Sequence, residues 1–552
     1  MTYSDPPPCP YHAGMIRSNM LALGLALTSV SLACQPAEQT LTVAHAADSL
    51  SIDTFMSHMK ALSSDAMAGR RPGTPGYDSA AAYVVREAEA LGLEPGGMQG
   101  TFLQSISFRR ASLDDSEPAF SVNGDRLSFG SDFSVSPRTT RAHVDLTAPM
   151  VFLGFGISAP DLDYDDFEDV DITGKLAVVI AGAPDEFGSL ERTVLSSSAS
   201  RDAELRQRGA AGVIVVQTGE LNGTVRPRTR YVYPDDRAPD AVVSEELEAS
   251  LIVPQRIVAD WTARAGRNFD DVVSSIRSGE PSSFDLSAEG HVLAGFEFET
   301  FESANVSALL PGSDPALRDE ILVLTAHLDH LGIGAVIAGD SVYNGTLDNA
   351  SGSSALLTLA SVLTRMDAPR RSILFLWVTA EESGLLGAEY FARFPTVSPR
   401  RIVANQNIDG VMGMITAATD VLAFGYEHSN LSEAVDYAVG LTGTPVSPDP
   451  TPEENLFIRS DQYAFVRNGI PAIWVQGGRT GLDPARDPQA ELDAWIIERY
   501  HKPSDDLVQP LDLEGVRREL RANLLVTYHI TSEMGPIEWD PDSFLYRRWV
   551  GG

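Results

Sequence analysis

Cysteine is almost absent from this chain: its 552 residues include two, Cys9 and Cys34, both close to the N-terminus. The sequence beyond residue 34 can therefore form no internal disulfide and offers no thiolate to a metal ion. A metal site in that part of the chain would have to use histidine, aspartate and glutamate side chains.

Basic residues are also scarce. The chain has 41 Lys and Arg against 76 Asp and Glu, which gives a formal net charge of -35 at pH 7. Such a surface repels nucleic acid and anionic lipid, so we expect neither as a partner. With 43% hydrophobic residues and a mean hydropathy of -0.06, the composition is that of a soluble globular protein, and the length predicts at least two domains.

Long hydrophobic runs are missing near the N-terminus too, where the apolar stretch at 20–27 is too short to span a bilayer permanently. We interpret residues 1–34 as an export signal. The small residues before Cys34 resemble a bacterial lipoprotein processing site, although Ser31 stands where an aliphatic residue is usual; an Ala-x-Ala site at 44–46 is the alternative. The expected location is the periplasm or the outer membrane, with a lipid on Cys34 as the membrane contact, or else secretion.

The rest of the chain changes character several times. Near residue 143 a new alternation of strand-like and helical segments begins, and it ends by about residue 290. From Glu320 onward the pattern is strongly α/β, with apolar runs that suit parallel strands covered on both faces. The expected parts are a linker at 35–48, a first part of the main domain at 49–142, an insert at 143–289, a catalytic part at 290–538 and a C-terminal tail at 539–552.

Two adjacent glutamates, Glu381 and Glu382, directly follow the apolar strand predicted at residues 371–380. A buried strand that delivers two like charges side by side carries a cost in desolvation and repulsion. A metal ion would offset that cost, with one glutamate as ligand and the other free for proton transfer. The alternative is that the pair is the solvated start of the following helix, where the helix dipole favours acidic residues.

Other strand ends carry the same kinds of side chain. In open α/β sheets, functional residues gather just past the carboxyl ends of the strands. Those positions hold the segments His327-Leu328-Asp329, Leu347-Asp348-Asn349, Asn407-Ile408-Asp409 and Tyr500-His501. Nitrogen and oxygen ligands of this kind suit zinc, with cobalt or manganese as substitutes. Three carboxylates and one bridging hydroxide would neutralise two divalent cations, so the charges favour two ions over one.

Four ordered motifs resemble the co-catalytic dizinc aminopeptidase family, which includes relatives of leucyl aminopeptidases, aminopeptidase Y and glutamate carboxypeptidase. The motifs are Ala326–Gly332, Asp348–Gly352, Glu381–Gly387 and Tyr500–Asp506. The resemblance implies a zinc exopeptidase fold, which is a three-layer α/β sandwich around a mixed, mostly parallel sheet. Residues 143–289 resemble an inserted α/β protease-associated domain.

The resemblance also implies a role for each matching residue. Five side chains would bind metal: His327 and Asp409 one zinc, Glu382 and His501 the other, and Asp348 both. Glu381 would be the general base, taking a proton from the metal-bound water, which attacks as a hydroxide bridging the two zinc ions, and passing that proton to the leaving amine. Asp329 would orient His327, and the Asp348–Asn349 bond would be cis. Tyr500 would bind the developing oxyanion; a plain packing role is its alternative.

Two neighbouring residues receive other interpretations. His330 lies beside the site but matches no ligand position, so we expect it to be structural. Asp461 is expected either to shape the pocket or to cap a helix.

These roles predict an exported enzyme that releases N-terminal residues from peptides. A carboxypeptidase or dipeptidase on the same core is the alternative, and it would need a cationic group for a terminal carboxylate, for which Arg459, Arg467 and Arg479 are candidates. A non-catalytic, receptor-like relative should have lost ligands, and none is lost here. The insert could bind a partner or act as a lid, and we favour the lid. The sequence does not determine the oligomeric state.

Overall fold

A computed structural model describes residues 43–217, 229–233 and 246–551. The predicted export signal, both cysteines and the lipid site lie outside these residues. Within the described part, no helix combines the length and the apolar character needed to cross a membrane.

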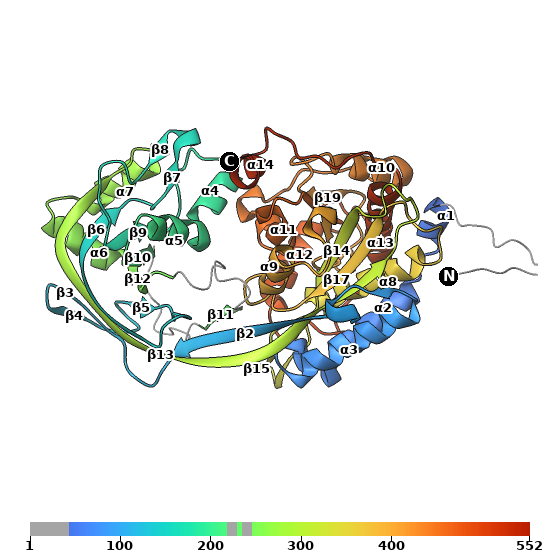
Figure 1. Cartoon of the computed structure of the whole chain (residues 1–552), viewed down its shortest axis with the longest axis horizontal. Helices are drawn as coiled ribbons and strands as arrows, with labels where there is room; N and C mark the ends of the chain where they lie inside the picture. The colour runs from blue at the N-terminus through green and yellow to red at the C-terminus, as the bar shows by residue number, and fades with distance from the viewer. Residues whose placement is uncertain (1–42, 218–228, 234–245, 552) are drawn as a thin grey trace, which may run out of the picture. The chain divides into compact units, whose positions relative to one another are not determined.

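The catalytic part is built on a mixed, mostly parallel sheet (Figure 1). Four parallel strands form its centre in the order β20 (Ala472–Gly477), β18 (Ile402–Asn407), β14 (Ile321–His327) and β17 (Ser372–Val378). The antiparallel strands β19 (Val421–Phe424) and β13 (Ser283–Leu310) flank this centre. The register pairs His327 with Val378 and Thr325 with Asn407, so the carboxyl ends of β14, β17 and β18 lie at one edge.

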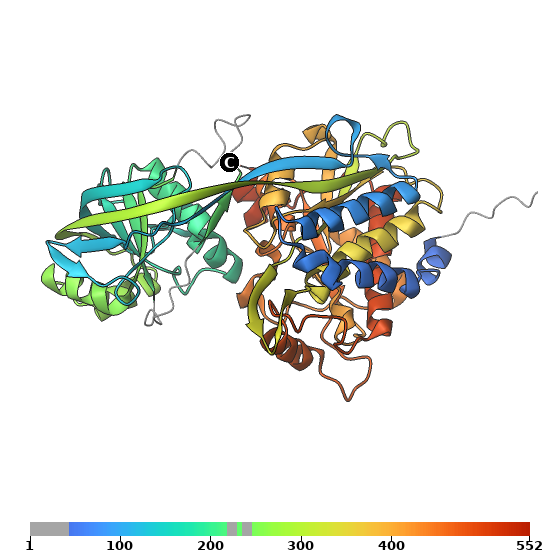
Figure 2. The same cartoon turned by 90° about the horizontal axis from the view of Figure 1, so that it is seen from below.

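Helices cover both faces of this sheet, as the sequence predicts. One face carries α2 (Ile52–Leu62), α3 (Pro75–Ala90), α8 (Gly352–Leu363) and α13 (Leu513–Ser532), which share one hydrophobic core (Figure 2). The other face carries α9 (Leu386–Arg393) and α11 (Gln462–Arg467). The result is the predicted three-layer arrangement.

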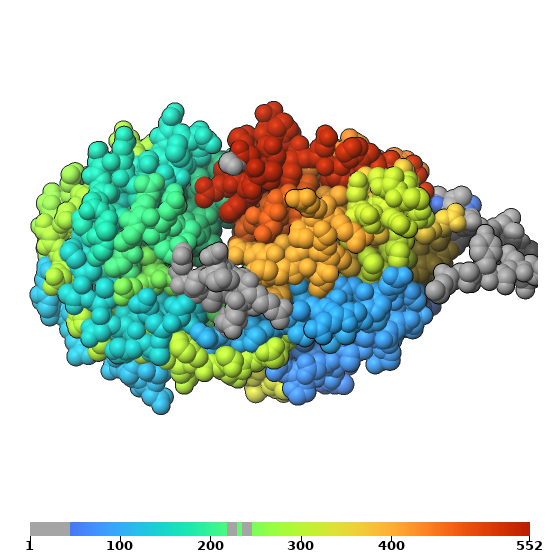
Figure 3. Space-filling view, in the orientation of Figure 1, coloured from blue at the N-terminus to red at the C-terminus, as the bar shows by residue number. Residues whose placement is uncertain are grey.

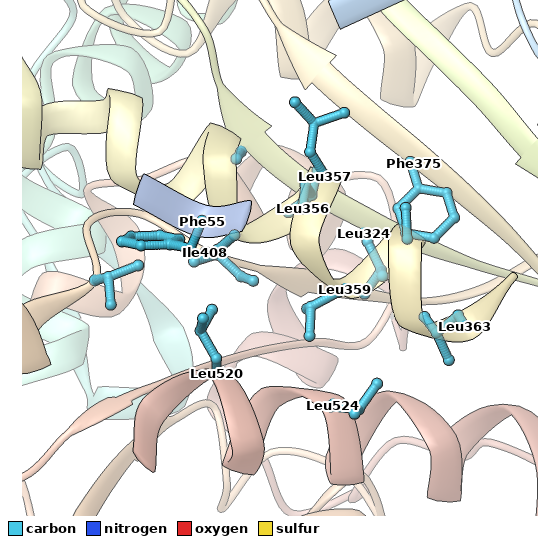
Figure 4. Packing of buried hydrophobic residues seen from close by; sticks show 14 of the residues in the cluster. Phe55, Leu324, Leu356, Leu357, Leu359, Leu363, Phe375, Ile408, Leu520 and Leu524 are labelled. Carbon is cyan, nitrogen blue, oxygen red and sulfur yellow. The ribbon is translucent and has the colours of Figure 1, made fainter. Parts of the chain in front are cut away.

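Helix α8 lies at the centre of the larger core. All but one of its twelve residues are buried, so neighbouring elements enclose it around its whole circumference. In Figure 4, Leu356, Leu359 and Leu363 lie among side chains from the sheet and from α13, including Leu324 and Leu524. This packing fixes the start of α8, where Asp348 lies in the preceding segment.

Residues 143–289 form a second parallel sheet with its own hydrophobic core. Its parallel strands are β6 (His143–Leu153), β9 (Leu176–Ile180), β10 (Gly212–Gln217) and β12 (Ala249–Pro254). Strand β13 pairs with β6 through its first half, and with β2 (Leu103–Leu113) and β17 through its second. The predicted boundary between residues 289 and 290 thus falls inside one continuous strand. The identity of this part as a protease-associated domain stays a prediction.

The predicted linker and the predicted C-terminal tail each contain a packed helix. Helix α1 (Val43–Asp48) occupies the end of the expected linker and buries Ala46 and Ala47. Helix α14 (Phe544–Trp549) occupies the expected tail, and its Leu545 joins an apolar cluster with Val194 of α4 (Ser189–Ser196). Figure 3 shows this C-terminal segment, in red, against the green segment that carries α4. Short apolar patterns at these ends gave no clear periodicity, which is why the sequence did not predict them.

Candidate metal centre

The predicted ligands converge at the edge where the parallel strands end. His327 is the last residue of β14, and Asp409 lies two residues beyond β18. Glu381 and Glu382 follow β17 after a tight turn in which Ala380 has a φ of 57°. Asp348 comes from the segment before α8, and His501 from the loop after α12 (Pro488–Glu498). The Asp348–Asn349 peptide bond is cis, as the resemblance implies.

One group of ligand atoms forms around His327. Its Nε2 lies 3.1 Å from Asp409 Oδ1 and 3.2 Å from Asp348 Oδ1. Glu381 Oε2 is farther away, at 3.9 Å. Ligand atoms of His327, Asp348 and Asp409 all lie within 4.8 Å of one another, close enough to hold one metal ion.

A second group forms on the other side of Asp348. His501 Nε2 lies 3.2 Å from Asp348 Oδ2 and 3.1 Å from Glu382 Oε2. The two oxygens of Asp348 therefore face different histidines. The structure brings all five predicted ligands together in the pairing that the resemblance implies.

His330 is closer to this second group than the sequence indicated. Its Nδ1 lies 2.7 Å from Glu382 Oε1, and together with Asp348 and Glu382 it has the spacing of a metal site. Its Nε2 is buried and has no hydrogen-bond partner among the described residues. Glu382 thus has a histidine on each carboxylate oxygen, His330 and His501. The position of His330 three residues after His327, at a strand end, was the available signal.

The two glutamates differ in their surroundings. Neither starts a helix, because α9 begins only at Leu386, and their side chains are 12% and 8% exposed. Burial raises the pKa of Glu381, and the charges of Asp409 and Asp461 raise it further, so it lies well above its ordinary value. Burial also acts on Glu382, but hydrogen bonds with His330 and His501 leave its pKa below its ordinary value. The pair is therefore split into a carboxylate that stays charged and one that holds a proton more readily.

The carboxylate of Asp329 holds the glutamate turn. It accepts hydrogen bonds from the backbone N–H of Glu381 at 3.1 Å and of Glu382 at 3.4 Å. The Nδ1 of His327 is 3.2 Å from the backbone carbonyl oxygen of Asp329 but 4.0 Å from its carboxylate. The nearer contact of Asp329 with His327 is therefore through its backbone carbonyl, and its carboxylate lies farther away.

Two buried residues, Arg70 and Asp505, hold backbone segments that lie next to predicted ligands. The sequence predicted a role for neither of them. Arg70 is fully buried and donates to the backbone carbonyls of Leu62, Leu328, Asn344 and Gly345. Asp505 accepts hydrogen bonds from the backbone N–H groups of Leu347 and Asp348. Together they fix the loop that carries Asp348 and the segment after β14. Asp505 belongs to a motif that carried the resemblance and Arg70 does not, but both side chains act on backbone that the sequence does not place.

Tyr500 and Asp461 occupy distinct positions at the centre. The Tyr500 ring stacks on His501 with centroids 3.8 Å apart, and the residue is 40% exposed. Asp461 is fully buried, and its side chain makes no capping bond to α11 and has no hydrogen-bond partner among the described residues. Helix capping is therefore excluded for Asp461.

The three candidate arginines all have other partners. Arg459 pairs with Glu454 at 3.0 Å, and Arg467 pairs with Glu389 at 2.5 Å. Arg479 donates to the carbonyl of Gly477 at 2.8 Å and to the side chain of Gln489 at 3.0 Å. Each of the three guanidinium groups is thus already engaged by another part of the chain.

The charges of the centre fit divalent metal ions. Burial lowers the pKa of His327, yet Glu381 and Asp409 raise it well above its ordinary value. Burial likewise disfavours the charged form of His501. Asp348 and Glu382 favour that form more strongly, and the pKa of His501 rises to about 10. The carboxylates thus attract positive charge onto both histidines, and a metal ion supplies that charge while leaving the imidazoles neutral. The histidine and carboxylate donors are those that zinc prefers.

Comparisons with known proteins agree with this geometry. Residues 305–526 match the model of Peptidase family M28. Leupeptin-inactivating enzyme 1 of Streptomyces exfoliatus is 30% identical over 249 residues, which cover 42% of this chain and 51% of that protein. Probable leucine aminopeptidase 2 of Aspergillus fumigatus is 24% identical over 386 residues, or 68% and 65% of the two chains. The chain thus spans about half to two thirds of the length of these relatives.

A solved structure shares the fold across almost the whole chain. The aminopeptidase from Aneurinibacillus sp. strain AM-1 superposes with a TM-score of 0.52 at 19% identity, covering 91% of this chain and 99% of that one. At this identity the likeness supports the architecture alone. The fold and the strand-end motifs agree with the match of residues 305–526 to the model of Peptidase family M28.

Proposed function

We propose that this chain is a metal-dependent exopeptidase that removes N-terminal residues from peptides with two zinc ions and Glu381 as general base. The observation that carries the proposal is the bridging position of Asp348. One of its oxygens faces His327 and the other faces His501. Each histidine also has a second carboxylate, Asp409 or Glu382, while Glu381 lies at 3.9 Å from His327 and belongs to neither pair.

The residues divide the work as follows. His327 and Asp409 would hold one ion, His501 and Glu382 the other, and Asp348 both. When bound, the ions polarise the scissile carbonyl and make a water molecule acidic enough to be a nucleophile. Glu381 would take up a proton from water and give it to the leaving amine, and the burial that raises its pKa suits it to hold the proton between these two transfers. Tyr500, stacked on His501 and partly exposed, is placed to donate a hydrogen bond to the oxygen that gains charge.

The charge of the site favours the amino end of a peptide. Acidic side chains surround the centre, and an N-terminal ammonium complements them. A carboxypeptidase would need a free cation for the terminal carboxylate, and Arg459, Arg467 and Arg479 all have other partners. The names of the relatives, a leucine aminopeptidase and an enzyme that inactivates leupeptin, support peptide substrates.

A substrate panel tests the proposal directly. The purified protein would be given a set of aminoacyl peptides, the same peptides with a blocked N-terminus, and the same peptides with an amidated C-terminus. We expect cleavage of free-amine peptides whether or not the C-terminus is amidated, loss of cleavage with a chelator, and recovery with zinc. Cleavage of blocked peptides from the carboxyl end would overturn the proposal.

A further inference from the structure

Helix α4 of the insert is hydrogen-bonded to a loop of the catalytic part. Ser189, the first residue of α4, donates from its hydroxyl to the carbonyl of Pro452 at 2.7 Å. The same hydroxyl oxygen accepts a bond from Asn455 Nδ2 at 2.9 Å. Val194, on the same helix, is fully buried in one apolar cluster with Phe457. The insert therefore contacts residues 452–457 through both polar and apolar side chains.

Asn455 is the residue at which that loop changes direction between two short helices. It lies between the short helices η8 (Pro452–Glu454) and η9 (Leu456–Ile458), with a φ of 49° and a ψ of 48°. Asparagine is one of the few residues that tolerate this left-handed conformation, at a cost that local hydrogen bonds must offset. Its side-chain amide supplies two such bonds, to Ser189 of the insert and to the carbonyl of Glu453. Removing the Ser189 hydroxyl would therefore remove one of the bonds that hold Asn455 in this conformation.

Buried hydrogen bonds continue from this loop to the metal centre. Gln462 Nε2 donates to the carbonyl of Phe457 at 2.6 Å. Asn407 Nδ2 donates to Gln462 Oε1 at 2.7 Å and to Ser460 Oγ at 2.8 Å, and its Oδ1 accepts from Thr325 Oγ1 at 2.7 Å. Asn407 precedes Asp409 by two residues, and Thr325 precedes His327 by two. The loop is thus tied to the strand ends that carry both predicted ligands of one metal ion.

Asp461 depends on this network for its position. It lies between Ser460 and Gln462, the two residues bound by Asn407, and its own carboxylate has no hydrogen-bond partner among the described residues. It is fully buried, and burial raises its pKa well above the ordinary value, with Asp409 adding to the shift. A shift of the loop would therefore move a buried acid whose position depends on the hydrogen bonds of its two neighbours.

We propose that Ser189 and Asn455 are positioning residues for the catalytic centre, so that the insert holds the loop whose hydrogen bonds reach the strand ends that carry His327 and Asp409. The inference rests on the proposed function for its effect on catalysis, but its structural part stands on the hydrogen bonds alone. It gives the insert a role besides that of a lid or a docking domain. Ser189 and Asn455 act through other residues and touch no predicted ligand.

The test compares the full-length Ser189→Ala protein with a matched control, Ser197→Ala. Ser197 caps α5 (Ser198–Gln207) within the insert, through a bond from the Ser200 N–H, and its hydroxyl donates to the carbonyl of Val194 at the end of α4 but makes no hydrogen bond to residues 452–457. Amide hydrogen exchange is measured first, with no substrate present. We expect Ser189→Ala to speed exchange in peptides that cover residues 452–462 and 403–409, and Ser197→Ala to speed it only around α5 and the end of α4. Unchanged exchange at 452–462 and 403–409 in Ser189→Ala would overturn the inference whatever the activity.

Kinetics on a free-amine peptide give the second measurement. We expect Ser189→Ala to lower kcat by roughly threefold to tenfold with little change in KM or in zinc content, and Ser189→Thr, which keeps the hydroxyl, to restore it. Asn455→Asp should behave like Ser189→Ala, and the double variant should be no worse than either single one. A wild-type protein with no turnover would contradict the proposed function and leave the exchange result to decide the inference. A normal kcat in Ser189→Ala from an active wild type would overturn the coupling to catalysis.

Discussion

Two parallel sheets of similar construction lie in this one chain, yet the side chains at their strand ends differ completely. In the catalytic part, the ends of β14, β17 and β18 deliver a histidine, two glutamates and an aspartate to one point. In the insert, β9 is followed by Ala181 and Gly182, β10 ends at Gln217, and β12 ends at Pro254. Among the described residues, both groups with metal-site spacing lie in the catalytic part. The sheet aligns strand ends in either case, but the residues placed there decide whether a site exists.

Buried acids show the same contrast. In the insert, Asp166 is buried and accepts hydrogen bonds from the backbone N–H groups of Phe155 and Ile157 and from the hydroxyl of Tyr164. Its neighbours already satisfy it, so it needs no cation. At the candidate metal centre, the carboxylates of Asp348 and Glu382 face histidines and one another. A bound cation would compensate their negative charge. Burying an acid is thus compatible with a purely structural role or with a catalytic one, depending on what it faces.

The largest effect is expected from Asp348→Ala. Removing the carboxylate that faces both histidines should release both metal ions and abolish peptide hydrolysis, because each group loses a ligand at once. Metal analysis after dialysis, alongside the peptidase assay, measures this. Retention of two zinc ions per chain would refute the bridging role. The insert variant Asp166→Asn serves as the control and should keep its metal.

Glu381→Gln should separate chemistry from metal binding. The amide keeps the shape of the side chain but cannot accept the proton, so we expect kcat to fall by about 10²–10⁴-fold while both metal ions stay bound. Zinc content and the Kd for a non-cleaved peptide analogue should change little. Wild-type turnover in this variant would exclude Glu381 as the general base.

Much of the catalytic sheet could be predicted because its signals are local. The apolar strand predicted at 371–380 appears as β17, and the α/β pattern predicted from Glu320 onward appears as β14, β18 and β20 with the helices around them. Strand ends in a parallel sheet meet at one edge, which is why the five ligands could be proposed together from separate motifs.

Other features depend on distant contacts and could not be predicted. Strand β13 has 28 residues, far beyond an ordinary strand, because it pairs in turn with strands of two sheets. Arg70 acts on carbonyls more than 250 residues away in sequence, from Leu328 to Gly345. The side chain of Asp329 turned out to hold the glutamate turn, since backbone N–H groups there need an acceptor. The residue type alone does not show which distant backbone group a side chain will bind.

The smallest effect on catalysis, and a clear one on stability, is expected from Asp166→Asn in the insert. Burial raises the pKa of Asp166 from 3.8 to about 7, despite the hydrogen bonds that oppose the shift. Between these values the folded protein binds more protons than the unfolded chain, so this group makes stability fall as pH rises from about 4 to about 7. The shift corresponds to at most about 4 kcal/mol at pH 8.

Asparagine removes that titration while keeping the contacts. Its side-chain oxygen can accept from the N–H groups of Phe155 and Ile157, and its amide can donate to the oxygen of Tyr164. The melting temperature of Asp166→Asn should therefore decline less between pH 5 and pH 8, as the two limits of a scan, than that of the wild type. Some decline should remain, because burial also raises the pKa of Glu519, in the catalytic part, to about 7. Because Asp166 contacts no predicted ligand, kcat at neutral pH should stay at the wild-type value. Parallel melting curves across this pH range would show that Asp166 is charged in the fold, and a lost kcat would show that the two sheets are less independent than their strand ends indicate.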